Sequence, residues 1–300
     1  MSLRMLLPDA DADAFLTGWP TEAYVVDRTP TELDEAITPA ALDEYVNLGC
    51  IPAAEIAAIK APNPSLNRDA FMINGRTDAQ KLNHLKENGF TLRLGNLQRV
   101  IPFMATLSRA IQNETGYSNY VHAFITPGGE QGLRHHWDQQ LAVIVQLQGV
   151  KTWQLWRPPV EAPMREYNES FRVWRAEFIP EWEAAGPDLE VHLKPGQALV
   201  LPRGWVHNPH CRETDQESIH LTFAIRERTR FWLAEKLLAG AIQDPEFRRL
   251  ILPRFITGAG LGAVAEEVRK QLLEYLDTVV AGDLVKSLRD AAMSELEYTT

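Results

Sequence analysis

Two histidines and one aspartate stand at positions from which they can bind one metal ion. His136 and Asp138 are separated by a single residue, and His207 follows a Pro-x-Gly turn further along the chain. Two neutral imidazoles and one carboxylate occupy one face of an octahedral ion and leave three positions open, which is the ligand arrangement of the non-haem Fe(II) oxygenases. The residues therefore predict a metal centre at which chemistry takes place.

The elements that carry these ligands follow from the local sequence. Alternate side chains of a β-strand share a face, so His136 and Asp138 can face one ion from a strand end while His135 and Trp137 point the other way. Residues 193–207 have the pattern of a turn, a buried apolar strand, a second turn and the ligand His207. An antiparallel barrel would bring the two segments together.

Other roles are open for the same residues. His207 can be a turn histidine after the Pro/Gly pair, and Asp138 can cap a strand end. The sequence His-x-x-His-Cys at residues 207–211 also places three zinc-ligand types close together. However, Pro209 makes simultaneous ligation by His207, His210 and Cys211 awkward.

Composition limits the class of protein. The chain has 300 residues, of which 45% are hydrophobic, enough for a sizeable core and one or two domains. A formal net charge of -10 argues against direct, sequence-independent binding to nucleic acid. The two cysteines provide no disulfide framework, and no segment resembles a signal peptide or reaches membrane-spanning length. We therefore expect a globular cytoplasmic protein with no membrane partner.

Hydrophobic periodicity divides the chain into three regions. Residues 1–116 are expected to form helices and strands that support the core, with helices at 11–16, 38–48, 78–88 and 101–114 and strands at 23–26 and 90–94.

Residues 117–228 carry short apolar or alternating runs separated by glycine and proline, the pattern of a jelly roll. The expected strands are 120–126, 141–147, 151–156, 189–193, 198–201 and 219–225. Residues 157–187 are rich in charge, tryptophan and proline, and they are interpreted as an insertion between strands. The fold class is therefore a cupin-like, double-stranded β-helix core with helices.

Residues 229–300 return to helical spacing, with expected helices at 231–242, 245–252 and from 262 to about 296, interrupted near Gly282. The apolar positions include Leu272, Leu273, Tyr275 and Leu276. They are compatible with packing inside the chain or with a homodimer through residues 229–300.

Four segments together resemble a known enzyme family. They are residues 90–102, 128–138 (GGEQGLRHHWD), 143–153 (VIVQLQGVKTW) and 218–223 (SIHLTF). In order and content they look like the JmjC oxygenases, specifically the ribosomal-oxygenase branch of the cupin-like enzymes. The resemblance covers residues 15–228 and is strongest around the predicted ligands.

The resemblance implies a cofactor set and a reaction. His136, Asp138 and His207 would bind Fe(II), and Lys151 stands where a cation holds the distal carboxylate of 2-oxoglutarate. The alternative for Lys151 is an exposed lysine after a hairpin turn. With O2, such enzymes couple the oxidative decarboxylation of 2-oxoglutarate to hydroxylation of a side chain in a protein or peptide. By analogy, the β-carbon of a histidine or an arginine is the expected target.

Further residues are weaker candidates for the pocket. Asn119, Phe124 and Thr126 are predicted on the co-substrate side, with Thr126 as a hydrogen-bond donor. On the substrate side the candidates are Gln139, His122, His210 and His220.

The chain departs from the family in two places. Enzymes of this branch carry a helical dimerisation segment and then a winged-helix domain, whereas the residues after Arg228 have room for the first only. Residues 157–187 and the pair Gln139 and Gln140 are also unlike the family. The alternative function is a cupin metalloprotein, an isomerase, dioxygenase or binding module, that does not use 2-oxoglutarate. Lys151 and Asp138 distinguish the two hypotheses.

Overall fold

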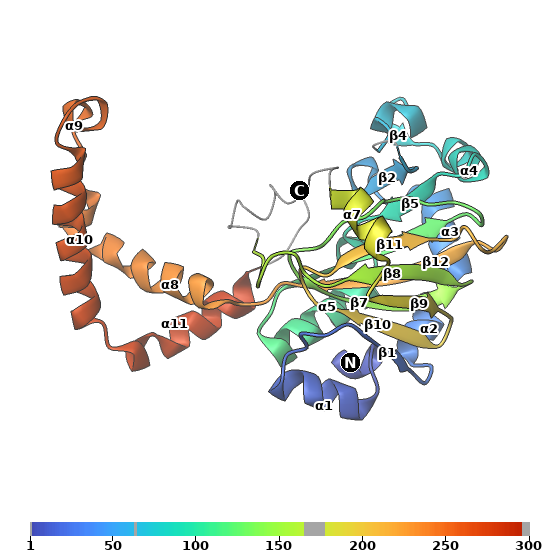
Figure 1. The fold of residues 1–300 in the computed structure, drawn as a ribbon, viewed down its shortest axis with the longest axis horizontal. Helices are drawn as coiled ribbons and strands as arrows, with labels where there is room; N and C mark the ends of the chain where they lie inside the picture. The colour runs from blue at the N-terminus through green and yellow to red at the C-terminus, as the bar shows by residue number, and fades with distance from the viewer. Residues whose placement is uncertain (1, 63–64, 165–177, 296–300) are drawn as a thin grey trace. The chain divides into compact units, whose positions relative to one another are not determined.

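Residues 1–227 are built around a seven-stranded antiparallel sheet (Figure 1). A computed structural model describes residues 2–62, 65–164 and 178–295 of the chain. The strand order is β1-β10-β7-β12-β6-β5-β2, and every neighbouring pair is antiparallel. The strands are β1 (Tyr24–Asp27), β2 (Ile56–Ile59), β5 (Thr91–Leu94), β6 (Asn119–Thr126), β7 (Leu141–Gln148), β10 (Gln197–Leu201) and β12 (Ser218–Ile225).

A smaller sheet with the order β11-β8-β9 faces the first. Its strands are β8 (Lys151–Trp156), β9 (Leu189–Leu193) and β11 (Val206–His210). One hydrophobic cluster joins side chains of both sheets, among them Ile144 of β7, Leu199 of β10, Leu155 of β8 and Leu193 of β9. Two antiparallel sheets that share an inner core are a jelly roll. The predicted fold class is therefore confirmed.

Helices cover the other face of the large sheet. Because strand side chains alternate, residues such as Val121, Val143 and Phe223 point away from the small sheet, and they belong to a second core built with the N-terminal helices. These elements are η1 (Leu3–Met5), α1 (Asp9–Thr17), α2 (Glu32–Ala36), α3 (Pro39–Asn47), η2 (Ala53–Glu55), η3 (Arg68–Phe71), α4 (Ala79–Glu87), η4 (Leu97–Arg99) and α5 (Pro102–Thr115), with a hairpin of β3 (Met72–Ile73) and β4 (Arg76–Thr77). The large sheet is thus buried on both faces.

Most predicted elements are present, and their ends follow local chemistry. The Thr38 side chain accepts a hydrogen bond from the Ala41 backbone N–H and caps α3, which has Pro39 in its first turn. Helix α5 ends at Gly116, which has a left-handed φ of 73°. All six strands predicted between residues 117 and 228 are confirmed.

Three features differ from the sequence-based expectation. Strands β1, β2 and β5 belong to the large sheet, so part of residues 1–116 is built into the core sheet itself. His207 lies within an additional strand, β11 (Val206–His210), and not in a turn. His136 does not end a strand: it forms an isolated bridge with His207 in an otherwise irregular segment.

Residues 228–295 form a second compact unit, separate from residues 1–227. It consists of α8 (Arg230–Ala239), η5 (Gly240–Gln243), η6 (Pro245–Arg248), α9 (Pro253–Thr257), α10 (Leu261–Thr278) and α11 (Ala281–Ser294). The expected helix at 245–252 is a short 3-10 helix, and the expected break near Gly282 falls just before α11. Within the unit, the Tyr275 hydroxyl of α10 donates to the Leu237 carbonyl of α8. No helix in the described part of the chain is long and apolar enough to span a membrane.

Candidate metal centre

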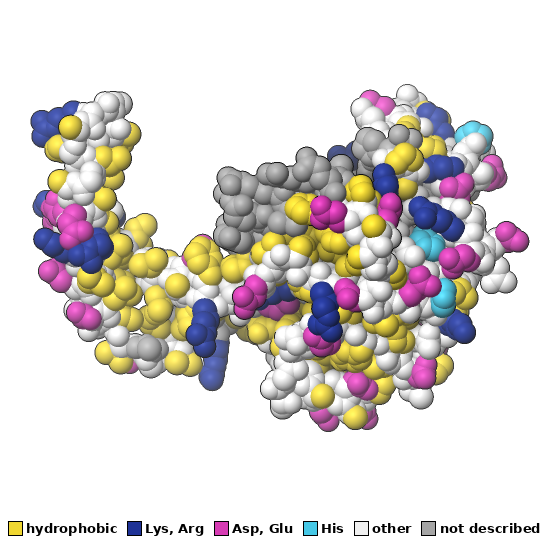
Figure 2. All heavy atoms as spheres, in the orientation of Figure 1, with side chains coloured by type: hydrophobic (Ala, Val, Ile, Leu, Met, Phe, Trp, Pro, Cys, Tyr) yellow, Lys and Arg dark blue, Asp and Glu magenta, His cyan; other side chains and the backbone are white. Residues whose placement is uncertain are grey.

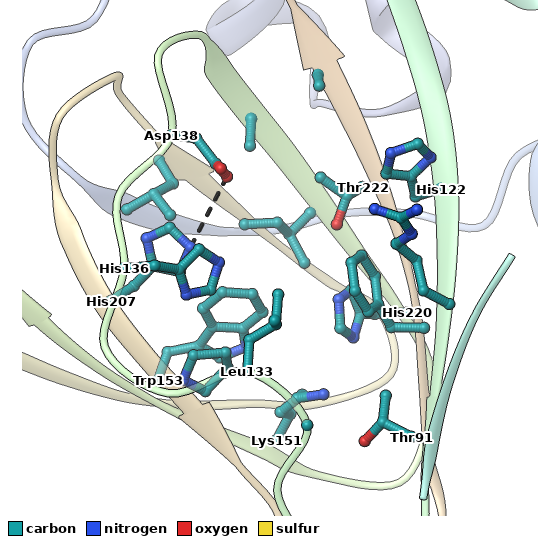
Figure 3. A pocket seen from close by; sticks show the side chains of 18 of the residues that line it. Thr91, His122, Leu133, His136, Asp138, Lys151, Trp153, His207, His220 and Thr222 are labelled. Atoms are coloured by element: carbon teal, nitrogen blue, oxygen red, sulfur yellow. Dashed lines mark ion pairs between the residues drawn. The ribbon is translucent and has the colours of Figure 1, made fainter. Parts of the chain in front are cut away.

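The three predicted ligands lie together in the structure (Figure 3). His136, Asp138 and His207 each offer a ligand atom, and these atoms lie within 4.8 Å of one another. The His207 Nε2 to Asp138 Oδ2 distance is 3.8 Å, and the two imidazole ring centroids are 4.0 Å apart. The predicted convergence is confirmed, and the geometry suits one small cation held by two nitrogens and one oxygen.

Backbone hydrogen bonds bring the two ligand segments together. The His136 N–H donates to the His207 carbonyl at 2.9 Å, and the His207 N–H donates to the His136 carbonyl at 2.6 Å. The Gly204 N–H donates to the Asp138 carbonyl at 2.8 Å. Each segment therefore fixes the backbone of the other at the ligands.

Each histidine also has its ring oriented by a backbone carbonyl. The Nδ1 atom of His136 lies 2.7 Å from the Arg134 carbonyl oxygen, and Nδ1 of His207 lies 3.0 Å from that of Trp205. A carbonyl oxygen only accepts, so the hydrogen bond assigns the proton to Nδ1 and the lone pair to Nε2. Burial, and then the neighbouring His136, hold the pKa of His207 well below its usual value. His207 is therefore neutral, as a metal ligand must be.

A cavity of about 260 Å³ extends from this triad between the two sheets. Its walls come from alternate positions of neighbouring strands, as expected for side chains on one face of each sheet. The lining residues include Thr91 and Arg93 of β5, Tyr120, His122 and Phe124 of β6, Ala142 and Ile144 of β7, Lys151 and Trp153 of β8, Leu201 of β10, His207 and Pro209 of β11, and His220, Thr222 and Ala224 of β12.

Lys151 is a buried cation in this cavity, away from Asp138 (Figure 3). Its side chain donates from Nζ to Thr126 Oγ1 at 2.8 Å, and Thr126 Oγ1 also accepts from Thr91 Oγ1 at 3.1 Å. Among the described residues it forms no ion pair, and burial lowers its pKa to about 8. A buried cation without an acidic partner is costly, and an anion that enters the cavity can neutralise it.

Aromatic rings form the wall of the cavity near this lysine. Phe124 stacks on His220 with centroids 5.0 Å apart and an interplanar angle of 13°, and Trp153 meets the His220 ring edge to face at 5.4 Å. Burial, and then Lys151, hold the pKa of His220 well below its usual value. This wall is therefore mainly apolar and uncharged.

His122 lies across the cavity from the triad (Figure 3). Its Nδ1 accepts a hydrogen bond from the Asn96 backbone N–H at 3.1 Å, which places the ring proton on Nε2. Burial, and then Arg93, lower the pKa of His122 to about 4, so the ring is neutral.

Four predicted pocket residues, Asn119, Thr126, Gln139 and His210, do not line the cavity. Asn119 faces the helical side of the large sheet, where its Nδ2 donates to the Ser108 carbonyl of α5, because odd positions of β6 point away from the cavity. His210 is aligned with Thr152 on the outer face of the small sheet. Gln139 is half-buried outside the cavity. Thr126 contributes through its hydrogen bond to Lys151.

The zinc-cluster alternative is not seen among the described residues, where the only such group found is His136, Asp138 and His207. His207 faces the cavity and His210 faces outward, since three positions along a strand reverse the direction of a side chain.

Sequence reasoning missed several lining residues, notably Arg93, Tyr120 and Thr222. Alternation could have found Tyr120, which stands two positions before His122 in the same predicted strand. Arg93 is a charged residue between Leu92 and Leu94 in a predicted apolar strand, an exception that signals a polar site inside the core.

Comparisons with known proteins agree with this geometry. Residues 93–231 match the JmjC domain. Ribosomal oxygenase 1 of Gallus gallus is 30% identical over 169 residues, which are 54% of this chain and 27% of that protein. The bifunctional lysine-specific demethylase and histidyl-hydroxylase NO66 of Aedes aegypti is 23% identical over 298 residues, covering 96% of this chain and 46% of that protein. The chain thus spans less than half of the length of either relative.

Solved structures show the same fold. YcfD, a ribosomal oxygenase from Escherichia coli, superimposes with a TM-score of 0.60 in its complex with cobalt and succinic acid, at 14% identity, over 98% of this chain and 73% of YcfD. Its complex with cobalt and 2-oxoglutarate gives a TM-score of 0.58. Residues 93–231 are therefore similar to a JmjC domain, the chain is similar in sequence to proteins named ribosomal oxygenases, and it shares the fold of YcfD.

Proposed function

We propose that this protein is an Fe(II)- and 2-oxoglutarate-dependent oxygenase that hydroxylates a side chain of a protein or peptide. The observation that carries the proposal is the presence, in one cavity, of a two-histidine, one-carboxylate group and a buried lysine. The similarity to YcfD, which has been solved with cobalt and 2-oxoglutarate, supports the same cofactor set.

The donor set fits the cofactors. His136, Asp138 and His207 would hold Fe(II) through two neutral nitrogens and one carboxylate oxygen. When bound, the iron supplies the chemistry that couples O2 and the decarboxylation of 2-oxoglutarate, to succinate and CO2, with insertion of one oxygen atom into a C–H bond. An ion held by these three residues would have coordination positions left for a bidentate co-substrate and O2.

The residues of this chain position and shield the reactants. Lys151 would pair with the distal carboxylate of 2-oxoglutarate, and Thr126 holds the ammonium group in place. Phe124, Trp153 and His220 would pack against the co-substrate and exclude water from the metal side of the cavity.

The cupin metalloprotein that does not use 2-oxoglutarate is the alternative. It explains the triad but provides no reason to bury an ammonium group in the same cavity, where charge burial is unfavourable. A dicarboxylate supplies that reason, so the oxygenase is the preferred hypothesis.

The proposed target is the β-carbon of a histidine or arginine in a protein. The histidyl-hydroxylase activity in the name of the NO66 relatives supports a histidine, and the net charge of -10 favours a basic polypeptide partner over nucleic acid. We also propose a homodimer through residues 229–300, because the helical unit exposes many apolar side chains.

Anaerobic titration with Fe(II) and 2-oxoglutarate tests the cofactor proposal. Wild-type protein should develop the weak visible metal-to-ligand charge-transfer band. His207→Ala should abolish the band by removing a ligand, and Lys151→Ala should weaken 2-oxoglutarate binding by about 100-fold, as expected for loss of a buried charge pair.

Lys194→Ala is the matched control, because Lys194 is an exposed lysine beyond β9 and its loss should leave the band unchanged. Iron binding without any 2-oxoglutarate affinity would favour the plain cupin hypothesis. If the band forms, screening of basic peptides by mass spectrometry for the gain of one oxygen atom identifies the substrate.

A further inference from the structure

The segment that carries two of the three proposed ligands has little support from the sheets. Between β6 and β7 the backbone is irregular, and His136 is its single bridge residue, paired with His207. A strand in a full ladder is fixed by hydrogen bonds on each side, whereas the backbone hydrogen bonds of His136 and Asp138 run to the segment of Gly204 and His207, so side-chain packing is needed to support the other side. Side chains on the face of the segment that points away from the cavity provide this support.

The outer face of the segment, which is the face opposite the cavity, consists of buried aromatic side chains. His136 and Asp138 point into the cavity, and the neighbouring His135 and Trp137 are both buried, at 3% and 5% exposure. His135 lies between two tryptophans: its ring centroid is 5.0 Å from that of Trp156 in β8 and 6.1 Å from that of Trp182, with which it stacks at 21°.

Trp182 belongs to the helix α7 (Phe178–Ala185), which lies in the region interpreted as an insertion between strands. It packs with Trp137, Trp156 and Val206 in one apolar cluster, and the Trp156 Nε1 donates to the Trp182 carbonyl at 3.1 Å. Val206 precedes the ligand His207 in β11. The cluster therefore contacts both ligand segments from outside the cavity.

Stacking is the interaction that fixes His135. Neither of its ring nitrogens has a hydrogen-bond partner among the described residues, so only packing orients the ring. A nearby ion pair, Arg134 to Glu183 at 4.0 Å, is exposed and weak. If Trp182 is removed, His135 loses one of its two aromatic neighbours, and the adjacent His136 loses packing behind it while its backbone hydrogen bonds to His207 are still present.

We propose that Trp182 is a positioning residue for the metal centre: helix α7 covers the outer face of the ligand segment and holds His136 and Asp138 in ligating geometry. This proposal rests on the metal-binding part of the proposed function. It gives the insertion a role, since α7 would set metal affinity without contacting the metal.

Titration with Co(II), followed by its visible absorption and by calorimetry, tests the proposal without requiring activity. Trp182→Ala should weaken Co(II) binding by about tenfold, the scale of an outer partner of a metal ligand. Trp182→Phe keeps an aromatic ring beside His135 and should bind almost as the wild type does. Glu181→Ala, at an exposed position of the same helix, is the matched control and should leave affinity unchanged.

A second control separates positioning from stability. Val46→Ala removes a buried side chain of α3 and lowers the melting temperature without contacting the ligand segment. Trp182→Ala should weaken Co(II) binding whereas Val46→Ala should not. If both variants only lose stability and keep wild-type affinity, the proposal is wrong. Should Trp182→Ala not fold, Trp182→Leu, which keeps apolar bulk but not stacking, carries the same expectation.

The outcome also separates this proposal from the proposed function. Wild-type protein that binds Co(II) but not 2-oxoglutarate would contradict the oxygenase while the positioning role of Trp182 is still supported by the Co(II) series. Wild-type protein that binds no Co(II) would overturn both.

Discussion

At the scale of single residues, the site combines the three metal-ligand side chains with a buried lysine, and each of these two groups needs a partner of opposite charge. The triad presents neutral imidazoles and a carboxylate at a distance that suits one cation, and Lys151 presents a buried positive charge with no acidic partner among the described residues. The first group has the chemistry of a metal site, and the second has the chemistry of an anion site. A ligand that joins them must bind metal at one end and carry a negative charge at the other.

The protonation of Lys151 predicts how binding depends on pH. Burial lowers its pKa to about 8, so in the empty protein the ammonium form is dominant below pH 8 and is lost above it. The affinity for 2-oxoglutarate should therefore fall as the pH rises through 8, by up to about tenfold for each further pH unit. Titrations at a series of pH values, with Co(II) bound, measure this dependence.

Lys151→Arg is the control, because a guanidinium group stays protonated throughout this range. Where the variant binds 2-oxoglutarate, its affinity should not show the decrease near pH 8. A wild-type affinity that is constant on both sides of pH 8 would contradict the role of Lys151 as the charge partner.

At the scale of elements, the β7–β8 hairpin delivers Lys151 to the cavity. Its turn contains Gly149, which has a left-handed φ of 64° and approaches the backbone of Glu217 so closely that a Cβ atom would collide with the Glu217 carbonyl oxygen. Lys151 follows two residues later as the first residue of β8. The hairpin therefore requires glycine at position 149 for two reasons: the left-handed backbone conformation and the lack of space for a Cβ atom.

Gly149→Ala should destabilise the protein and displace Lys151. We expect the free energy of unfolding to fall by about 2 to 4 kcal/mol, the sum of a left-handed strain of about 1 kcal/mol and a backbone collision of similar or larger size. Chemical denaturation measures the loss, and the affinity for 2-oxoglutarate should fall with it.

The control for this change is Gly196→Ala in the turn between β9 and β10. Gly196 has a φ of 84° and open space around its Cα, so alanine there adds strain without a collision. If the free energy of unfolding decreases equally in the two variants, the close approach of Gly149 to Glu217 has no effect on stability.

At the scale of the whole molecule, the two compact units differ in how they bury apolar side chains. Residues 1–227 enclose two hydrophobic cores around the large sheet, whereas the helices of residues 228–295 leave large apolar side chains exposed, as the hydrophobic surface in Figure 2 shows. Leu250 is 88% exposed and Ile242 is 60% exposed. Such surfaces usually mark an interface, and a second copy of the same unit can supply a matching apolar surface.

The proposed homodimer predicts a mass twice that of one chain in sedimentation equilibrium. A paired change in the helical unit, Ile242→Asp with Leu250→Asp, should produce monomers, because it places charges in an apolar interface. The matched control is Lys270→Asp, at an exposed polar position of α10, which should stay dimeric. A wild-type protein that sediments as a monomer at micromolar concentration would contradict the dimer.

The sequence by itself determined the local features of this protein. Alternating apolar runs and glycine or proline breaks define the six strands between residues 117 and 228, and the helix ends follow from caps such as Thr38 and Gly116, because these signals act over a few residues. The chemical types and spacing of His136, Asp138 and His207 likewise predicted a metal site, and the family resemblance added Lys151 as the partner of an anion.

Only the tertiary structure decided what depends on distant neighbours. The ligand segment is irregular, and its position depends on β11 and on tryptophans from β8 and α7. The direction of Asn119 and His210 away from the cavity, and the contribution of Arg93 to it, follow from the alignment of strands that are remote in sequence. Local pattern specifies which side chains share a face, but the pairing of strands determines which face encloses the site.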